Sequence, residues 1–318
     1  MKAAIVREPG KTPAYADFRD PVAQAGEELI IVKASALSHV TKSRASGSHY
    51  ASSGSLPAVV GMDGVGRTRD GRRVYFVMPE APFGGMAEKV VVKQEQCVPV
   101  PDGVEDVTAA AIAISGMSSW AAFKERAHLV AGETVLINGA TGTSGSLAVQ
   151  IAKLMGAKKV IATGRNIAAL EELQSLGADV TIPLVQSPNE LETAFKEQFG
   201  GEGVDVVLDY LWGPSAELLI VAAAKAGKDA VPIRFVQIGA LSGGSITLPS
   251  AALRSSALVL MGSGIGSISL ENMLRAIRGV MQAVIPGKLK IQTEAVPLAR
   301  VEEMWNKDSG KSRIVFVP

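Results

Sequence analysis

The 318-residue sequence contains few cysteine, histidine and aromatic residues, and its net charge is close to zero. Its single cysteine, Cys97, excludes an intramolecular disulfide and any metal site built from several cysteines, and it favours a reducing compartment. The 32 Lys and Arg residues balance 31 Asp and Glu residues, without a long run of either sign. We therefore expect a cytoplasmic protein with no dedicated surface for nucleic acid.

Long apolar runs are missing too. Residues 108–123 form the longest weakly polar stretch, which is shorter than a membrane span and rich in small residues. Near the start of the chain, Arg7 and Glu8 come before the apolar core of a signal peptide could form. We expect neither a targeting peptide nor a membrane segment.

Two patterns follow each other along the chain. Up to about residue 107 the apolar runs are short and β-like, with Gly, Pro, Ser and Asp clusters between them, which predicts a small, mainly β domain. From residue 108 apolar strands alternate with helical segments, which predicts an α/β fold with a doubly wound parallel sheet covered on both faces. The last stretch is expected to return to the first domain. The expected strands of the sheet are residues 133–138, 158–163, 178–183, 204–211, 233–239 and 257–262.

A glycine-rich turn joins the first of these strands to a helix. Residues 137–157 read INGATGTSGSLAVQIAKLMGA, in which the turn runs directly into an apolar helical pattern. In this context the turn matches the dinucleotide fingerprint with alanine in the first position. A tight strand-to-helix connection in some other α/β protein is the open alternative. The fingerprint predicts that the pyrophosphate is bound by Ala140, Thr141, Gly142, Thr143, Ser144 and Gly145.

The residues at the end of the second strand indicate which dinucleotide binds. An NAD site usually carries an acidic residue there, which bonds the adenosine ribose hydroxyls. Here the strand is followed by Gly164, Arg165 and Asn166, and the guanidinium of Arg165 suits a 2′-phosphate by its charge and fork geometry. The sequence therefore predicts NADP(H), with a solvated surface arginine as the alternative.

Two further loops follow strands at the same predicted edge of the sheet. One contains Gly239, Ala240 and Leu241, and the other contains Gly262, Ser263 and Gly264. Ligands bind at the carboxyl ends of strands in open α/β sheets, so main-chain groups of these loops could hold the nicotinamide. The second loop lacks the spacing of a fingerprint, and it can also be read as a plain connection out of the last strand.

With these residues in place, the chain resembles the medium-chain dehydrogenase/reductase superfamily, and within it the zinc-independent quinone oxidoreductase branch, which includes zeta-crystallin. The resemblance covers almost the full length and rests on the order and spacing of several segments taken together. These segments are MKAAIVREPG, GEELIIVKASALS, PAVVGMDGVG, FGGMAEKVVV, GATGTSGSLAVQIAKLMGA, VDVVLDYLWG, VQIGALSGG and GKSRIVFVP.

The resemblance implies a division of the chain and an assembly. A GroES-like domain would be formed by residues 1–115 and 268–318, around a Rossmann NADP(H)-binding domain at residues 116–267. It also implies a homodimer, in which the edge strand ending at Gly262 pairs across a two-fold axis.

The same resemblance implies that no zinc is bound. Zinc-dependent relatives take ligands from positions that here read Ser38, Met62 and Asp63, and from a segment that here is the apolar stretch 110–119. A hydroxyl and a thioether cannot replace a thiolate and an imidazole on Zn²⁺. Without a metal to polarise a carbonyl, a conjugated acceptor is the better substrate, so we expect NADPH to deliver hydride to a quinone or an enone.

Further site residues are implied by alignment with the family. Ser38 would lie beside the nicotinamide, and Tyr50 could stack on a quinone or donate a proton. A buried serine satisfied by the backbone and a surface tyrosine are the respective alternatives. His39 and His49 could relay a proton, with merely solvated loop histidines as the alternative, and Asp63 is interpreted as a structural carboxylate. Lys311 in the final GKSR could reach the cofactor phosphates, with a solvated turn as the alternative.

Two other functions remain open from the sequence. An enoyl-thioester reductase of the same superfamily would need a tunnel and a basic patch, and no basic cluster in the sequence demands one. A non-catalytic NADPH-binding protein, crystallin-like or regulatory, is possible as well. The physiological substrate is not readable, because specificity lies in loops such as residues 43–56 and 239–247.

Overall fold

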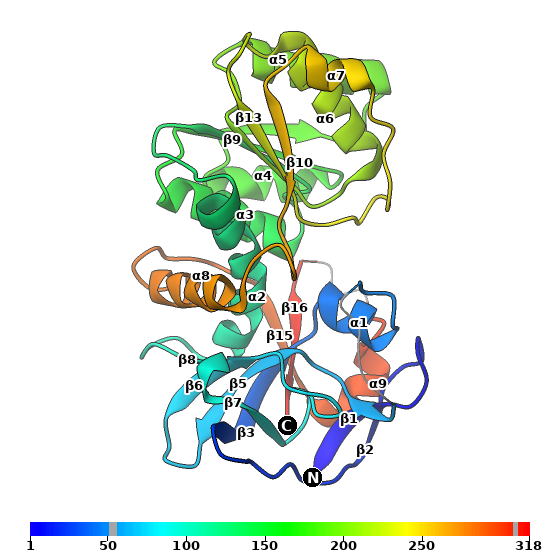
Figure 1. The fold of residues 1–318 in the computed structure, drawn as a ribbon, viewed down its shortest axis with the longest axis vertical. Coiled ribbons are helices and arrows are strands. Elements are labelled where there is room, and N and C mark those ends of the chain that lie inside the picture. Colours follow the sequence, from blue (N-terminus) through cyan, green and yellow to red (C-terminus); the bar gives the residue numbers. More distant parts are fainter. Residues whose placement is uncertain (51–55, 308–310) are drawn as a thin grey trace. The chain divides into compact units, whose positions relative to one another are not determined.

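The computed structural model describes residues 1–50, 56–307 and 311–318, so part of the predicted specificity loop 43–56 lies outside the described residues. The chain forms two compact units (Figure 1). The first unit comprises Met1–Ile114 together with Ile277–Pro318, and the second comprises Ser115–Ala276.

The second unit is built on a parallel sheet of six strands in the order β11-β10-β9-β12-β13-β14. Numbered from the start of this unit, that order is 3-2-1-4-5-6, the arrangement of dinucleotide-binding folds, in which the ligand lies at the carboxyl ends of the strands where the order reverses. The predicted doubly wound sheet is confirmed. Its strands are β9 Thr134–Asn138, β10 Lys159–Gly164, β11 Val180–Pro183, β12 Val206–Asp209, β13 Ile233–Gln237 and β14 Leu258–Gly262.

Apolar packing fixes the helices of this unit against the sheet. Phe195 and Phe199 of one helix and Leu219 of the next are fully buried together with Val207 and Phe235 of the sheet. Another helix, α3, packs against β9 and β10 and holds the glycine-rich turn in place. The helices are α3 Thr143–Leu154, α4 Ile167–Ser175, α5 Pro188–Gly200, α6 Gly213–Ala226 and the short α7 Ser250–Arg254.

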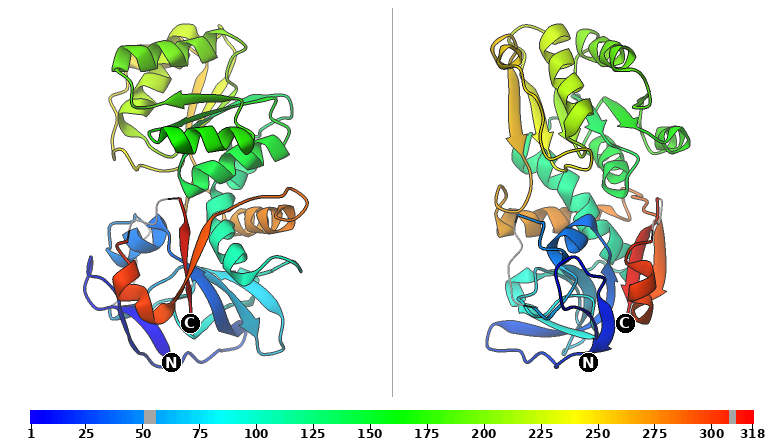
Figure 2. Two further views of the ribbon diagram at one scale, coloured as in Figure 1. Left: turned by 180° about the vertical axis from the view of Figure 1, so that it is seen from behind. Right: turned by 90° about the vertical axis from the view of Figure 1, so that its right-hand side faces the viewer.

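The first unit is mainly β (Figure 2). Its larger sheet has the order β15-β16-β3-β5-β6-β8, with β7 paired to β3, and its smaller sheet has the order β2-β1-β4. The strands are β1 Lys2–Val6, β2 Ala14–Asp17, β3 Glu27–Ala36, β4 Ala58–Val59, β5 Asp63–Thr68, β6 Arg73–Val77, β7 Lys89–Lys93, β8 Cys97–Pro99, β15 Thr293–Pro297 and β16 Arg313–Val317.

Both ends of the chain contribute to this unit. Strand β16 pairs antiparallel with β3, with Val315 opposite Ala36, and one core cluster contains Val6, Trp305 and Phe316. The helical segments of the unit are α1 His39–Ala45, η1 Gln94–Gln96, η3 Leu298–Arg300 and α9 Val301–Met304.

Two helices run from one unit into the other. Helix α2 spans Asp106–Ala121 and continues into a π-helix, η2, at Ala122–Arg126, while α8 spans Leu270–Ala283. No helix in the described part of the chain has an apolar stretch long enough to cross a bilayer.

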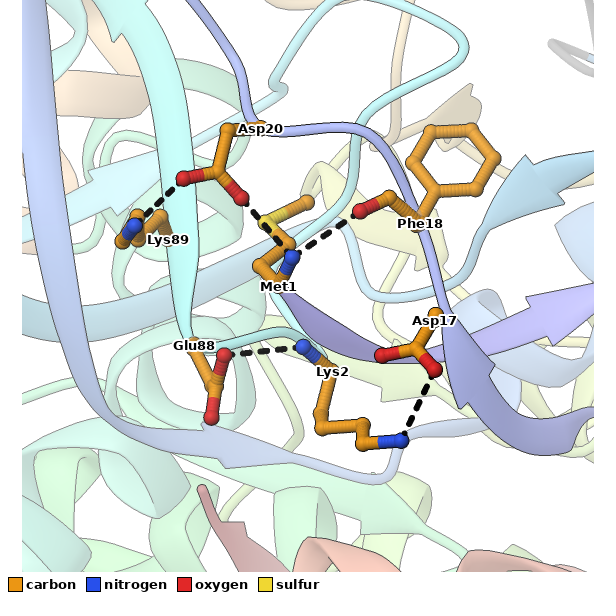
Figure 3. A network of polar contacts seen from close by, with 7 residues as sticks. All are labelled: Met1, Lys2, Asp17, Phe18, Asp20, Glu88 and Lys89. Atoms are coloured by element: carbon orange, nitrogen blue, oxygen red, sulfur yellow. Dashed lines mark hydrogen bonds and ion pairs between the residues drawn. The ribbon is translucent and has the colours of Figure 1, made fainter.

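The amino terminus is held by an exposed polar network on the first unit (Figure 3). The amino group of Met1 donates to Phe18 O at 2.9 Å and to Asp20 Oδ1 at 2.7 Å, and the Lys2 amide donates to Glu88 Oε2 at 2.8 Å. Hydrogen bonds from Lys89 and from the terminal amino group lower the pKa of Asp20 to about 2. Since water screens exposed ion pairs, we expect these pairs to contribute little to the stability of the fold.

Candidate functional site

The glycine-rich turn ends in a helix N-terminus that is open to an anion. Gly142 is the N-cap of α3 and provides no capping side chain. The amides of Thr143, Ser144 and Gly145 have no acceptor among the described residues, and the first amide of the helix to find one is that of Ser146, which donates to Gly142 O at 2.8 Å. Three free N–H groups and the positive end of the helix dipole therefore point to the same place.

Two glycines let the backbone approach closely around this turn. A Cβ atom at Gly145 would overlap Gly139 O and lie 2.6 Å from Ala140 Cα, and one at Gly164 would overlap the Thr141 side chain. At Gly142, in contrast, a Cβ would meet nothing within 4 Å. The turn is therefore tightly packed on its protein side and open on the side where a pyrophosphate could approach, so these residues fit a dinucleotide.

A buried polar network lies under the turn and joins three strand ends. Asn138 Nδ2 donates to Asp209 Oδ1 at 2.8 Å and to Ser215 Oγ at 2.9 Å. Thr163 Oγ1 donates to Asn138 Oδ1 at 2.7 Å and accepts the Gly139 amide at 3.2 Å. The network locks the carboxyl ends of β9, β10 and β12 together, directly beside the free amides.

Asp209 fixes the neighbouring turn as well. Its carboxylate accepts the amides of Leu211 at 3.0 Å and Trp212 at 3.1 Å. Burial raises the pKa of Asp209, while the hydrogen bonds from Leu211 and Asn138 oppose that rise. Asn138, Thr163 and Asp209 are not among the residues predicted from the sequence, although each is a polar residue at or near the end of an apolar strand, and that pattern is a usable signal.

Arg165 and Asn166 follow β10, as expected. Arg165 is exposed and forms no ion pair with any described residue. Asn166 caps α4, because its Oδ1 accepts the Ala169 amide at 3.0 Å. Asn166 therefore has a structural task in addition to any contact with a cofactor, whereas Arg165 has none in the described part of the chain.

The two predicted nicotinamide loops are joined to each other through Gln237. Its Nε2 donates to Gly239 O at 2.9 Å, and its carbonyl accepts the Ser263 amide at 2.9 Å. Ala240 and Leu241 are exposed, with Leu241 at 63%, and Gly264 is half-buried. Because β9, β13 and β14 are parallel, both loops lie at the same edge of the sheet as the glycine-rich turn.

In the first unit, Ser38 is the N-cap of α1. Its buried Oγ accepts the Thr41 amide at 3.0 Å and shares a hydrogen bond of 2.9 Å with Thr41 Oγ1. Tyr50 is 73% exposed, and its ring stacks on His49 with centroids 4.3 Å apart. No contact joins Ser38 to Tyr50 among the described residues, so their predicted shared role in catalysis stays a prediction.

The histidines of this region favour the neutral form. Burial, the nearby Arg313 and Lys42 lower the pKa of His39, and burial together with Arg44 lowers that of His49. Near neutral pH each ring is therefore unprotonated, so it can accept a proton but is not in the imidazolium form that donates one.

Asp63 is fully buried and accepts a hydrogen bond from Tyr75 Oη at 2.8 Å. Its other oxygen, Oδ1, has no hydrogen-bond partner among the described residues. Burial raises the pKa of Asp63 to about 7, against the hydrogen bond from Tyr75 and the charge of Arg313. Arg313 in turn donates from Nη1 to Leu37 O at 3.0 Å.

A cavity of about 670 Å³ opens in the first unit, and its wall contains Met62, the residue before Asp63. Met78 has φ = 57°, in the left-handed region, and its amide donates to Met62 O at 2.6 Å, which brings the two methionines together in the wall. The volume is ample for a ring system of drug size. The wall also includes Thr41, Arg44, Val60, Glu80 and Phe83.

Lys311 is half-buried, just before β16 in the first unit, whereas the other predicted cofactor residues belong to the second unit. Its predicted contact with the cofactor phosphates stays a prediction. Among residues 1–50, 56–307 and 311–318, no three His, Cys, Asp or Glu side chains lie close enough together to hold a metal ion.

Comparison with known proteins shows what the chain is similar to. Residues 145–279 match the family described as zinc-binding dehydrogenase, a segment that begins in the glycine-rich turn. The whole chain is 30% identical, over 361 aligned positions, to a protein of Emericella nidulans named probable NADPH-dependent quinone reductase tdiC, with 100% of both chains covered.

A solved structure and a larger enzyme are also similar. The quinone oxidoreductase from Thermus thermophilus, solved alone and with NADPH, is 25% identical and superposes with a TM-score of 0.82 over 100% of both chains. Erythronolide synthase EryA2 of Saccharopolyspora erythraea is 35% identical over 156 residues, which are 49% of this chain but only 4% of that protein.

Proposed function

Because the chain belongs to the medium-chain dehydrogenase/reductase superfamily, in its quinone oxidoreductase branch, we propose that it uses NADPH to reduce a quinone or an α,β-unsaturated carbonyl. The observation that carries the proposal is the set of three free amides at Thr143, Ser144 and Gly145, at the end of the first strand of a dinucleotide-type sheet.

The second unit would hold the cofactor. The amides of Thr143 to Gly145 would bind its pyrophosphate, and Arg165 would pair with the 2′-phosphate. The loops at Gly239–Leu241 and Gly262–Gly264 would bind the nicotinamide through main-chain groups. When bound, NADPH supplies the hydride that the acceptor receives.

The first unit would hold the acceptor. We assign the acceptor to the 670 Å³ cavity, whose wall contains Met62, Met78 and Phe83. Thioethers and a phenyl ring contact flat, polarisable molecules favourably. Among the described residues of the wall is Thr41, to which Ser38 is hydrogen-bonded, and through it Ser38 would help to orient the acceptor oxygen. Tyr50 is exposed outside this wall, and its role in covering the acceptor or donating a proton stays a prediction.

The proposed reaction needs no metal and no strong acid. Charge that develops on a quinone or an enone spreads over the conjugated system, so binding and orientation can provide most of the acceleration. The position that would face a zinc ion in relatives carries Met62, which is a poor ligand for Zn²⁺. The purified protein is therefore expected to keep its activity after treatment with a chelator.

The proposal is tested by following NADPH oxidation with four acceptors, namely 1,4-benzoquinone, 9,10-phenanthrenequinone, a simple enone and crotonyl-CoA, with and without EDTA. We expect turnover with at least one of the first three, at the same rate in both buffers. Turnover with none of the four, despite tight NADPH binding, would favour the non-catalytic alternative. Activity that EDTA abolishes and added zinc restores would contradict the metal-free mechanism.

The Arg165→Ala substitution is expected to raise the dissociation constant for NADPH about tenfold and to leave that for NADH unchanged. A charge-assisted hydrogen bond contributes about 1.5–3 kcal/mol, and we take the lower end because Arg165 is exposed. Fluorescence titration with both nucleotides measures the effect. Arg254→Ala is the matched control, since Arg254 lies on α7, which leads into the amino end of β14. An equal loss of affinity for NADPH and for NADH would exclude a role of Arg165 in recognising the 2′-phosphate.

An enoyl-thioester reductase remains the second candidate, favoured by the segment shared with erythronolide synthase. Crotonyl-CoA distinguishes the two functions, because a thioester reductase would turn it over faster than any quinone. The charged residues in the cavity wall are Arg44 and Glu80, a pair of opposite sign, which favours an acceptor without the many phosphates of coenzyme A.

We also propose a homodimer. Strand β14 is at the edge of the six-stranded sheet, so one side of its backbone is unpaired within the sheet, and Val259 on it is 44% exposed. An uncovered edge strand offers a row of unpaired N–H and C=O groups with which the same strand of a second copy can pair across a two-fold axis. Sedimentation velocity is expected to give twice the chain mass, and a monomer at micromolar concentration would contradict the proposal.

A further inference from the structure

The π-helix η2 at Ala122–Arg126 has a feature that the proposed function does not use. It continues α2 directly, and its five residues read AFKER. π-Helical turns are rare and cluster at functional sites, because the wider turn changes the direction in which side chains project. Two consecutive side chains of this turn, Glu125 and Arg126, reach elements that come much later in the sequence.

Arg126 reaches the end of the last strand of the sheet. Its Nε donates to Gly262 O at 2.8 Å, across 136 positions of sequence, and the side chain is half-buried. Gly262 is the final residue of β14 and the first of the predicted nicotinamide loop Gly262–Gly264. A charged donor on this carbonyl fixes the point at which the loop leaves the sheet.

Glu125 holds the far end of the same connection. Its carboxylate accepts Asn272 Nδ2 at 2.9 Å and Arg275 Nη2 at 2.9 and 3.0 Å, and both partners lie in the first turns of α8. The segment between β14 and α8 is therefore tied at both ends to one π-helical turn. A connection closed in this way has little freedom to change its path.

The restraint extends to the neighbouring loop. Ser263, the residue after the carbonyl that Arg126 holds, donates its amide to Gln237 O, and the Gln237 side chain donates to Gly239 O. A displacement at Gly262 would therefore pass to Gly239 through two hydrogen bonds. Arg126 thus lies at the start of a chain of contacts that joins both predicted nicotinamide loops.

We propose that Arg126 is a positioning residue that sets the orientation of the nicotinamide ring through Gly262 and Gln237. This inference rests on the proposed function, because it requires that the two loops bind the nicotinamide. The phosphate end of the dinucleotide is bound elsewhere, by the free amides of α3 and by Arg165. Arg126 therefore affects the reactivity of the bound cofactor more than its affinity, since a shift of about 1 Å in a reacting group can lower a rate about a hundredfold.

The test compares Arg126→Ala and Arg126→Lys with the wild type. For Arg126→Ala we expect kcat to fall at least tenfold with the best acceptor, while the dissociation constant for NADPH rises less than threefold. The emission of bound NADPH should shift towards that of the free nucleotide at unchanged stoichiometry, because the ring is no longer held. Arg126→Lys, which keeps a cationic donor, is expected to recover part of both signals. Lys124→Ala is the matched control, since Lys124 is exposed on the same π-helix.

Other outcomes would overturn the proposal. If Arg126→Ala has the kcat and the NADPH emission of the wild type, the hydrogen bond from Arg126 to Gly262 O is not needed to orient the nicotinamide ring. A loss of NADPH affinity as large as the loss of kcat would show a general structural role. If Arg126→Ala does not fold, Gln237→Ala removes the side-chain hydrogen bond to Gly239 O, the last contact in the chain, and must produce the same split between kcat and affinity. The emission measurement needs no acceptor, so a protein that binds NADPH but reduces nothing would refute the proposed activity and still test the role of Arg126.

Discussion

The Gly145→Ala substitution is expected to lower the free energy of unfolding of the second unit by about 1–3 kcal/mol and to raise the dissociation constant for NADPH at least tenfold. The added methyl group would overlap the Gly139 carbonyl and approach Ala140 Cα to 2.6 Å, and both are backbone atoms that a rotamer change cannot move. Helix α3 would have to shift away from the turn, which costs packing energy and displaces the free amides. Urea unfolding and fluorescence titration with NADPH measure the two effects.

Gly142→Ala is the matched control for this prediction. Apart from its chain neighbours, no described residue has an atom within 4 Å of a Cβ placed at Gly142, and the φ of −81° suits any residue. The substitution should leave the free energy of unfolding unchanged and still weaken NADPH binding, because the methyl group would occupy the space that the pyrophosphate approaches. If Gly142→Ala leaves NADPH affinity unchanged, the pyrophosphate does not bind at this turn and the central observation behind the proposed function fails.

The Asp63→Asn substitution is expected to remove a large pH dependence from the stability of the first unit. The pKa of Asp63 is about 7 in the fold, against the ordinary 3.8 of an aspartate in the unfolded chain, so the folded state binds a proton more tightly than the unfolded state between these values. The resulting stability is fully present below about pH 4 and is lost as the pH rises through 7. At 1.36 kcal/mol for each pH unit, the loss is about 4 kcal/mol.

The decisive measurement is the difference in the free energy of unfolding between pH 5 and pH 8, in the wild type and in Asp63→Asn. Using a difference removes effects that the substitution has at every pH, such as the changed surroundings of Arg313. Tyr75→Phe is the second variant, since loss of the hydrogen bond to Asp63 Oδ2 should raise the pKa of the carboxyl further and move the transition to higher pH. An equal pH dependence in wild type and Asp63→Asn would show that Asp63 is ionised throughout this range.

The sheet of the second unit could be predicted well because its central strands, such as β9 and β12, are buried on both faces. Runs such as Thr134–Asn138 and Val206–Asp209 are almost continuously apolar, and their ends differ from the expected ranges by one or two residues. The glycine-rich turn could be predicted because close contacts, such as that of Gly145 with Gly139 O, dictate where glycine must stand in it. The short strands β2 and β4 of the first unit escaped prediction, because runs of four and two residues carry no periodic signal.

Side-chain contacts across long stretches of sequence were the least predictable part of the site. Asn138 and Asp209 are 71 positions apart, and nothing in either local pattern shows that they form a hydrogen bond. Likewise, sequence alone could not show that Ser38 caps α1 or that Arg126 reaches Gly262. Such contacts depend on how the elements pack, whereas hydrophobic periodicity reports only which face of an element is buried.

The pairing of β16 with β3 has a consequence for the order in which the protein folds during its synthesis. Strand β3, at Glu27–Ala36, is made early but gains its neighbour β16 only after Arg313–Val317 has left the ribosome. The second unit is continuous in sequence at Ser115–Ala276 and can complete its sheet before that point. The dinucleotide-binding unit is thus expected to be folded on the nascent chain while the larger sheet of the first unit still lacks its last strands.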